Sequence, residues 1–180
     1  MTVKSKQIPT RKPKSLTGLK EFCEYVRKSF NNDEMILAEI GCWAGVSTQL
    51  FADYFRQVYA IDPWEKTKGT ISADYDMQEV ERLFDQNTKG LSVIKRKARS
   101  EDIAHEFPDD FFDLVYIDGE HTYEAVCRDI DNYIGKCKIA IAGHDYWPGR
   151  FDGVIKAVNE KLGLPDHVFD DTSWIKYICI

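Results

Sequence analysis

The sequence has no long hydrophobic run, because none of its apolar stretches approaches the roughly 18 residues that a membrane span requires. Its first residues carry positive charge but are not followed by the apolar segment of a secretory signal. These absences exclude a membrane-spanning helix and argue against export. We therefore expect a cytoplasmic protein with no membrane partner.

Cysteine is sparse and shows no pairing pattern. The five cysteines are odd in number, are scattered along the chain and form no Cys-x-x-Cys pair. This arrangement excludes a disulfide framework and a zinc knuckle. We interpret all of them as reduced core residues: Cys23, Cys42, Cys127, Cys137 and Cys179.

Acidic residues are absent from the first 20 positions, which hold six Lys or Arg. Since the whole chain has a net charge of −6, residues 21–180 carry −12. A basic arm can bind an anionic substrate or nucleic acid, but the acidic body argues against nucleic acid. We favour a solvated, partly flexible leader over residues 1–18, broken by Pro9 and Pro13. Its basic residues include Lys4, Lys6, Arg11, Lys12 and Lys14.

Internal repeats and low-complexity linkers are also missing, and 180 residues suffice for one well-buried domain, which we place at 19–180. Apolar segments typical of strands alternate with helical stripes, which predicts an α/β, doubly wound sheet of seven mostly parallel strands. Only residues 170–173 separate the last two strands, so these should form an antiparallel hairpin. The predicted strands lie at 35–38, 57–62, 91–95, 111–117, 139–142, 167–169 and 174–180. The helical stripes lie at 19–30, 50–55, 77–84, 100–107, 126–134 and 154–162.

The first strand leads into a glycine turn that lacks the dinucleotide-binding pattern. A dinucleotide pocket uses Gly-x-Gly-x-x-Gly so that the backbone can close on a pyrophosphate, whereas this turn reads Glu39-x-Gly41-x-x-x-Gly45. Glu39 has the wrong charge to lie beside a pyrophosphate. S-adenosylmethionine carries a sulfonium, an ammonium and a ribose diol without phosphate, so Glu39 and Asp62, at the end of the second strand, suit it. The turn therefore predicts this cofactor in preference to NAD.

Polar residues also follow the fourth and fifth predicted strands, at the edge where open α/β sheets bind ligands. Asp118 is followed by His121, and the fifth strand ends in His144 and Asp145. Carboxylates and waters suit Mg²⁺, whereas mixed imidazole and carboxylate ligands suit Mn²⁺, Fe²⁺ or Zn²⁺. Spacing alone does not name the metal, and either aspartate taken alone is equally well explained as a loop or helix cap.

A more specific signal comes from longer motifs around these residues. Residues 112–123 read Phe-Asp-Leu-Val-Tyr-Ile-Asp-Gly-Glu-His-Thr-Tyr, 140–146 read Ala-Ile-Ala-Gly-His-Asp-Tyr, and 153–158 read Gly-Val-Ile-Lys-Ala-Val. Together with the glycine turn they resemble class I S-adenosylmethionine-dependent methyltransferases, in the family that includes macrolide sugar O-methyltransferases and relatives of cephalosporin hydroxylase. The resemblance covers roughly residues 35–180.

The resemblance implies roles for particular residues. Asp118 and Asp145 would be metal ligands, and His121 the general base. The sugar-methylating members have a carboxylate where this chain has His144, which we take as a third candidate ligand. Arg99 and Ser100 match the position that flanks the adenine. The candidate cofactor-binding residues are Glu39, Gly41, Trp43, Gly45, Ser47, Asp62, Pro63, Arg99, Ser100 and Asp118.

The sequence says less about the methyl acceptor than about the cofactor. No large insertion forms an acceptor domain, so the acceptor is a small molecule, or a second copy of the chain in a homo-oligomer completes the site. Aromatic faces beside polar groups suit sugar or phenolic rings, so Tyr146 and Trp147 are candidate substrate walls. The simpler alternative is that Trp64 and Trp147 are packing residues at the bases of loops.

Three functions fit these observations. We favour metal-assisted O-methylation of a small hydroxylated acceptor, with His121 accepting its proton near neutral pH. A second is a non-haem-iron oxygenase, with Asp118, His121 and His144 as a two-His, one-carboxylate face. A third is a non-catalytic domain that binds the cofactor or a partner. A nicotinamide dehydrogenase is the weakest, because the pyrophosphate loop is absent.

Overall fold

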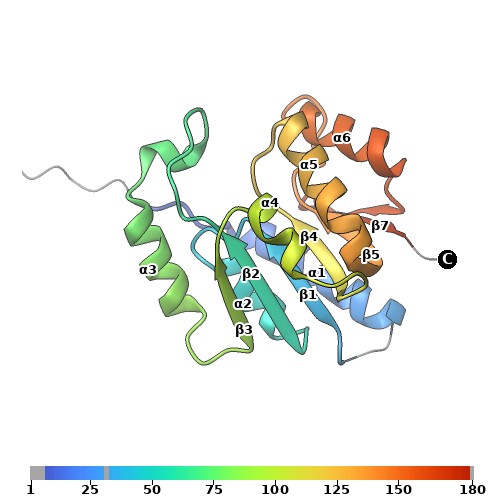
Figure 1. Ribbon diagram of the computed structural model, residues 1–180, viewed down its shortest axis with the longest axis horizontal. Coiled ribbons are helices and arrows are strands. Elements are labelled where there is room, and N and C mark those ends of the chain that lie inside the picture. Colours follow the sequence, from blue (N-terminus) through green and yellow to red (C-terminus); the bar gives the residue numbers. More distant parts are fainter. Residues whose placement is uncertain (1–6, 31–32, 179–180) are drawn as a thin grey trace, which may run out of the picture.

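The computed structural model describes residues 7–30 and 33–178, which form a seven-stranded sheet with helices on both faces (Figure 1). The strand order is β3-β2-β1-β4-β5-β7-β6. Strands β1 to β5 are parallel, β7 is antiparallel to β5, and β6 is antiparallel to β7. The predicted doubly wound sheet with an antiparallel C-terminal hairpin is confirmed. The strands are β1 Ile36–Ile40, β2 Gln57–Asp62, β3 Val93–Lys97, β4 Phe112–Ile117, β5 Cys137–Gly143, β6 His167–Val168 and β7 Trp174–Tyr177.

The helices cover the two faces of the sheet in separate groups. Helices α1 and α2 pack on one face, and α5 and α6 pack on the other, in front of the sheet in Figure 1. Within the described residues the helices are α1 Pro13–Phe30, α2 Val46–Ala52, α3 Met77–Asn87, α4 Ser100–Ile103, α5 Tyr123–Tyr133 and α6 Asp152–Leu162.

Alternate residues of the central strands divide between these two layers. In β4, which is buried along its whole length, Leu114 and Tyr116 join the cluster that contains α1 and α2. Val115 and Ile117 join the cluster that contains α5 and α6. Successive side chains of a strand point to opposite faces, and a parallel strand covered on both faces is apolar at nearly every position. This explains the continuous apolar runs of the sequence.

Most element boundaries differ from the predicted ones by a few residues, and those of α1 and β3 have a clear physical cause. Helix α1 begins at Pro13, not near residue 19, because proline is well suited to the first turn, where its missing N–H would have no helical partner. Residues 13–18 are therefore helical and not part of a flexible leader. Strand β3 runs from Val93 to Lys97, two residues later than predicted, since Leu91 accepts a turn hydrogen bond from the Val93 N–H.

Backbone hydrogen bonds bring the ends of the central strands to one level. The Asp118 N–H donates to the Ile40 carbonyl at 2.8 Å, and the His144 N–H donates to the Ile117 carbonyl at 3.0 Å. Asp62 is the last residue of β2, which pairs with β1. The acids that the sequence places after separate strands therefore lie along one edge of the sheet.

In the part of the chain that the structure describes, no helix combines the length and apolar character needed to cross a membrane. Cys23, Cys42 and Cys137 are buried free thiols, and Cys127 is a partly exposed one. Cys179 lies outside the described residues, as do Lys4 and Lys6 of the basic leader.

Candidate active site

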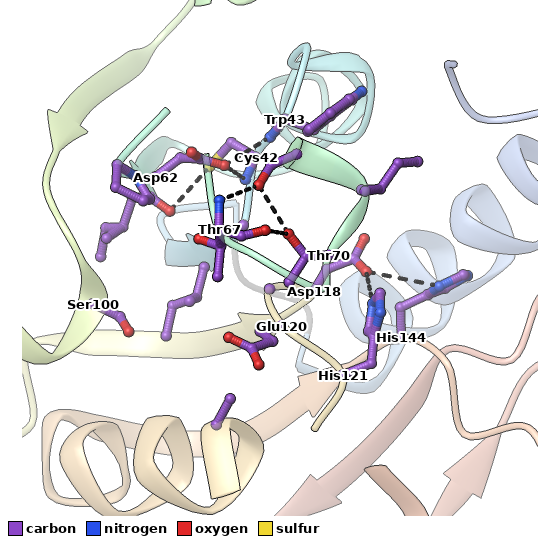
Figure 2. A pocket seen from close by; sticks show the side chains of 18 of the residues that line it. Cys42, Trp43, Asp62, Thr67, Thr70, Ser100, Asp118, Glu120, His121 and His144 are labelled. Atoms are coloured by element: carbon purple, nitrogen blue, oxygen red, sulfur yellow. Dashed lines mark hydrogen bonds and ion pairs between the residues drawn. The ribbon is translucent and has the colours of Figure 1, made fainter. Parts of the chain in front are cut away.

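A cavity of about 560 Å³ opens at the carboxyl ends of the parallel strands (Figure 2). Its walls come from the glycine turn after β1, the loops after β2 to β5, and the segment before α1. The structure therefore brings the predicted cofactor turn and the predicted metal cluster into one cavity. The predicted site residues that line it are Gly41, Trp43, Ser47, Asp62, Pro63, Arg99, Ser100, Asp118, His121, His144 and Asp145.

The two glycines of the turn have different tasks. Gly41 has φ +86°, and a Cβ there would collide with the backbone of Asp118 and Gly119. Glycine is thus required for the loops after β1 and β4 to touch. Gly45 has φ +78°, and its Cβ would lie 2.9 Å from the Phe84 ring on α3. Gly45 is not among the lining residues, so its task is to pack α2 against α3.

Asp62 fixes the shape of the turn through its carboxylate. Oδ2 accepts hydrogen bonds from the backbone N–H groups of Cys42 and Trp43, both at 3.0 Å, and Oδ1 accepts one from Trp64 at 2.7 Å. Burial raises the pKa of Asp62, and these three bonds act in the opposite direction. A carboxylate offers about four acceptor positions, so the oxygens at the cavity wall can still accept a ligand hydroxyl.

Glu39, a predicted cofactor-binding residue, does not line the cavity. Its side chain is fully buried, and its two oxygens accept hydrogen bonds from the Ser47 and Thr48 hydroxyls at the start of α2. Burial raises its pKa to about 7, although both hydroxyls lower it. Glu39 therefore connects β1 to the first turn of α2, because its two carboxylate oxygens accept hydrogen bonds from the Ser47 and Thr48 hydroxyls.

The loops after β4 and β5 form a compact cluster of acids and histidines. Nε2 of His121 lies 2.8 Å from Oδ2 of Asp145 and 3.8 Å from Oδ1 of Asp118. One ligand atom from each of these three residues falls within 4.8 Å of the others. Asp145 takes up a left-handed backbone angle, φ +63°, which Asp tolerates better than most residues.

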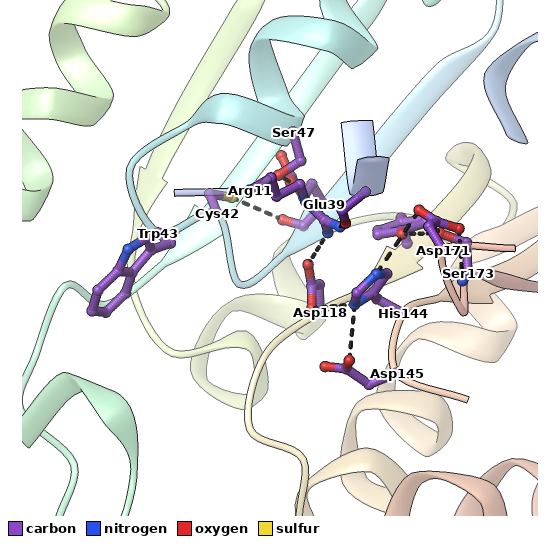
Figure 3. Close-up of polar contacts among 12 residues, drawn as sticks. Arg11, Glu39, Cys42, Trp43, Ser47, Asp118, His144, Asp145, Asp171 and Ser173 are labelled. Carbon is purple, nitrogen blue, oxygen red and sulfur yellow. Dashed lines mark hydrogen bonds and ion pairs between the residues drawn. The ribbon is translucent and has the colours of Figure 1, made fainter. Parts of the chain in front are cut away.

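His144 is placed differently from the predicted metal set of Asp118, His144 and Asp145. Its Nδ1 lies 3.1 Å from Oδ1 of Asp145, and its Nε2 faces the buried Asp171, 3.9 Å away. The compact trio therefore contains His121 in place of His144. The reason is that His144 is held between Asp145 and Asp171, whereas the loop after β4 turns His121 back over Asp145 (Figure 3 shows the His144 contacts).

The carboxylates control the charge of the histidines. Burial lowers the pKa of His121, but contacts with Asp118 and Asp145 outweigh it and raise the pKa to about 10. Although burial raises the pKa of Asp145, contacts with His121 and His144 hold it well below its usual range. In this state His121 is an imidazolium at neutral pH. The predicted base near neutral pH therefore requires that its carboxylate partners be engaged elsewhere.

The predicted substrate walls lie outside the cavity lining. The Tyr146 hydroxyl donates to Oδ1 of Asn159 on α6 at 2.8 Å. Trp147 is 45% exposed, and the guanidinium of Arg150, a lining residue, lies 4.8 Å from its ring centroid. Trp64 is a buried packing residue against Phe84, with ring centroids 4.7 Å apart. For Trp64 the simpler alternative, a packing role, is thus correct.

Arg11 and Asp129 also line the cavity, although neither is among the predicted site residues. Arg11 reaches into the cavity and pairs with Asp118, but nothing distinguishes it from the other basic residues before α1. Asp129 on α5 is buried and accepts a hydrogen bond from the Ser100 hydroxyl. The sequence does indicate that Asp129 is buried, since it lies on the same helix face as the apolar residues Val126 and Ile130.

Residues 38–146 match the protein family described as "Methyltransferase domain". The chain belongs to this family. The match runs from the glycine turn through Asp62 and Asp118 to Asp145, which are the parts of this methyltransferase that shape the cavity. The family implies S-adenosylmethionine as the methyl donor, so the predicted identification as a class I methyltransferase is confirmed.

Solved structures share the fold of the methyltransferase at low sequence identity. The O-methyltransferase NovP gives a TM-score of 0.68 at 18% identity, over 91% of this chain and 79% of that one. CalS11, a TDP-rhamnose 3'-O-methyltransferase of calicheamicin biosynthesis, gives 0.65 at 13% identity, over 94% and 82%. Precorrin 8w decarboxylase from Methanobacterium thermoautotrophicum gives 0.58 at 15% identity, over 85% and 74%. A search of curated proteins finds no match.

Proposed function

We propose that the methyltransferase transfers the methyl group of S-adenosylmethionine to a hydroxyl oxygen of a small sugar-like or phenolic acceptor. The observation that carries the proposal is the single cavity that joins the turn around Asp62 to the cluster of Asp118, His121 and Asp145. The shared fold of NovP and CalS11, both O-methyltransferases, supports oxygen as the methylated atom. We further propose that the protein acts in the cytoplasm.

The cavity suits the cofactor in its chemistry. Asp62 uses three acceptor positions for the turn and has room for a ribose hydroxyl. Arg99 and Ser100 line the wall beyond it, where the resemblance places the adenine. Gly41 lines the cavity at the point where the loops after β1 and β4 touch.

The acid and histidine cluster fits a divalent cation. Nε2 of His121 is buried and makes no hydrogen bond in the described structure, and it meets Asp145 only as a charge contact at 2.8 Å. Asp118 and Asp145 would hold the ion through their carboxylates, which suit Mg²⁺ or Mn²⁺, and the His121 imidazole lies within 4.8 Å of both. Such an ion would lower the pKa of an acceptor hydroxyl by Lewis acidity.

The chain's own residues then have to orient two reactants and remove one proton. The acceptor oxygen attacks the methyl carbon while the bond from that carbon to sulfur breaks, which leaves neutral S-adenosylhomocysteine, a methyl ether and a proton. Holding the reactants in line can supply roughly 7–11 kcal/mol of the barrier. His121 is the imidazole placed to accept the proton once Asp118 and Asp145 no longer hold its own, and such a base contributes about 10²–10⁴ in rate.

The iron-oxygenase alternative loses support from the geometry. It requires Asp118, His121 and His144 around one ion, whereas the compact trio contains Asp118, His121 and Asp145. His144 stays outside that trio, with Nε2 toward Asp171 and Nδ1 3.1 Å from Asp145 and 3.8 Å from Asp118. We therefore propose methyl transfer alone.

Calorimetric titration tests the proposal directly. S-adenosylmethionine and S-adenosylhomocysteine should bind, and NAD should not. Turnover should then be sought with a panel of small sugars and phenols, with Mg²⁺ or Mn²⁺ and with chelator. Tight binding of NAD alone would contradict the proposal, and full turnover in chelator would remove the metal from it.

A further inference from the structure

A largely shielded guanidinium, that of Arg11, lines the cavity. Nη2 of Arg11 pairs with Oδ2 of Asp118, and Nη1 donates to the Ser15 hydroxyl at 3.4 Å (Figure 3). The two charged side chains are only 13% and 17% exposed. The segment is anchored nearby, since the Trp43 indole N–H donates to the Pro9 carbonyl at 3.0 Å. Arg11 is therefore a fixed part of the cavity wall.

Arg11 differs from the other arginines that line the cavity. The side chains of Arg99 and Arg128 are 45% and 46% exposed and pair with Glu65 and Glu101 at the surface. Arg150 is exposed and stacks over Trp147. Among the described lining residues, Arg11 is thus the arginine whose charge is removed from bulk solvent, where a charge interaction with a ligand is strongest.

The surroundings keep Arg11 charged. A guanidinium does not lose its proton in proteins, and the carboxylate of Asp118 lies against it. A guanidinium has five N–H donors in a planar fork that matches a carboxylate. The described structure gives these donors two acceptors, Asp118 and Ser15. Arg11 lines the cavity, so its remaining N–H groups are available to a bound ligand.

The two oxygens of Asp118 face different partners. Oδ2 faces Arg11, whereas Oδ1 faces His121 and His144, each at 3.8 Å. Oδ1 therefore contacts the cluster that fits a metal, and Oδ2 contacts Arg11. A ligand that enters between Arg11 and Asp118 meets a positive and a negative charge side by side.

We infer that Arg11 and Asp118 bind the amino-acid end of S-adenosylmethionine, with Arg11 holding the α-carboxylate and Asp118 Oδ2 the α-ammonium. This inference rests on the proposed function. The amino-acid end is a zwitterion, so each of its charges meets the opposite charge of the pair. Without ligand, the two side chains neutralise each other, which avoids an unpaired buried charge. Arg11 is accordingly a cofactor-binding residue that selects ligands with a carboxylate.

The test compares adenosyl ligands that differ only at this end. Binding of S-adenosylhomocysteine, its decarboxylated analogue and its deaminated analogue is measured by calorimetry for the intact chain and for Arg11→Gln, Arg11→Lys and Asp118→Asn. We expect the intact chain to prefer S-adenosylhomocysteine to either analogue by roughly 10- to 100-fold, as for hydrogen bonds to charged groups. Arg11→Gln should abolish the preference over the decarboxylated analogue and keep the preference over the deaminated one. Asp118→Asn should do the reverse.

The controls separate recognition from folding. Lys12→Gln changes a neighbouring exposed base and should bind like the intact chain, and Arg11→Lys should keep part of the carboxylate preference because it keeps a cation. If Arg11→Gln weakens all three ligands equally, or leaves their ratios unchanged, the inference is overturned while the proposed function stands. If the intact chain binds none of the three ligands, the proposed function fails and this inference falls with it.

Discussion

Nε2 of His121 and Oδ2 of Asp145 lie 2.8 Å apart although they come from loops after different strands. The loop after β4 carries the imidazole and the loop after β5 carries the carboxylate. Asp145→Asn keeps the size of the side chain but removes the charge that this contact and the candidate cation site require. We expect turnover to fall by at least about 100-fold, with binding of S-adenosylhomocysteine retained.

Steady-state kinetics and calorimetry on the same preparation check this expectation. The matched control is Asp131→Asn, since Asp131 pairs with Lys161 at the surface and should turn over normally. Normal turnover by Asp145→Asn would show that the acidic cluster is not part of the reaction.

Asp129 gives stability a specific dependence on pH. Burial raises its pKa to about 6, although the Ser100 hydroxyl lowers it. Its usual value is about 4, so between pH 4 and 6 the folded chain binds more protons than the unfolded one. The free energy of unfolding from this group therefore falls as pH rises through that window, by on the order of 2–3 kcal/mol.

Asp129→Asn should remove that slope. Urea unfolding of both chains at several pH values from 4 to 8 measures it, and the difference between them isolates Asp129 from other titrating groups such as Glu39. Identical slopes would mean that Asp129 is not held in its protonated form.

Gly41→Ala should damage the turn more than its backbone angle alone explains. Gly41 and Gly90 have similar positive φ angles, +86° and +78°, but a Cβ meets the Asp118 backbone at Gly41 and open space at Gly90. Gly90→Ala should cost about 1–2 kcal/mol of unfolding free energy. Gly41→Ala should cost clearly more and weaken binding of S-adenosylhomocysteine. Equal costs in chemical denaturation would show that the two loops do not touch.

Asp62→Asn tests the anchor of the glycine turn. Asparagine keeps one acceptor oxygen, so its amide nitrogen loses either the N–H bonds from Cys42 and Trp43 or the one from Trp64. We expect the affinity for S-adenosylhomocysteine to fall by roughly 10-fold or more and the melting temperature to drop. Asp53→Asn, an exposed change just after α2, serves as the comparison. An unchanged affinity for Asp62→Asn would place the ribose elsewhere.

The fold could be predicted because burial on both faces leaves a strong pattern. Strand β4, apolar apart from Asp113, and the stripe of Leu19, Phe22 and Val26 each identify an element by period alone. The sheet topology then places Asp62, Asp118 and Asp145 along one edge, because parallel strands end at the same side. Edge strand β3 was predicted two residues early, since exposed Lys97 gives no apolar signal.

Side-chain directions could not be predicted from position in the chain. Glu39 stands at the edge with the other acids, yet Ser47 and Thr48 hold its carboxylate beneath the turn. His144 and His121 both follow strand ends in the sequence, but in the structure His144 directs Nε2 toward the buried side chain of Asp171 and only Nδ1 toward Asp145. The contact of Arg11 with Asp118 joins residues 107 positions apart, which no local pattern encodes.

The contact of Pro9 with Trp43 has a practical meaning for anyone who trims or tags the protein. A chain shortened to start at Pro13 would retain all the helices and strands that the structure describes, and would pass as a well-folded sample in circular dichroism. It would lack Arg11 and the carbonyl that fixes the Trp43 indole. Domain trimming guided by secondary structure would thus discard one wall of the cavity together with residues that look like a dispensable tail.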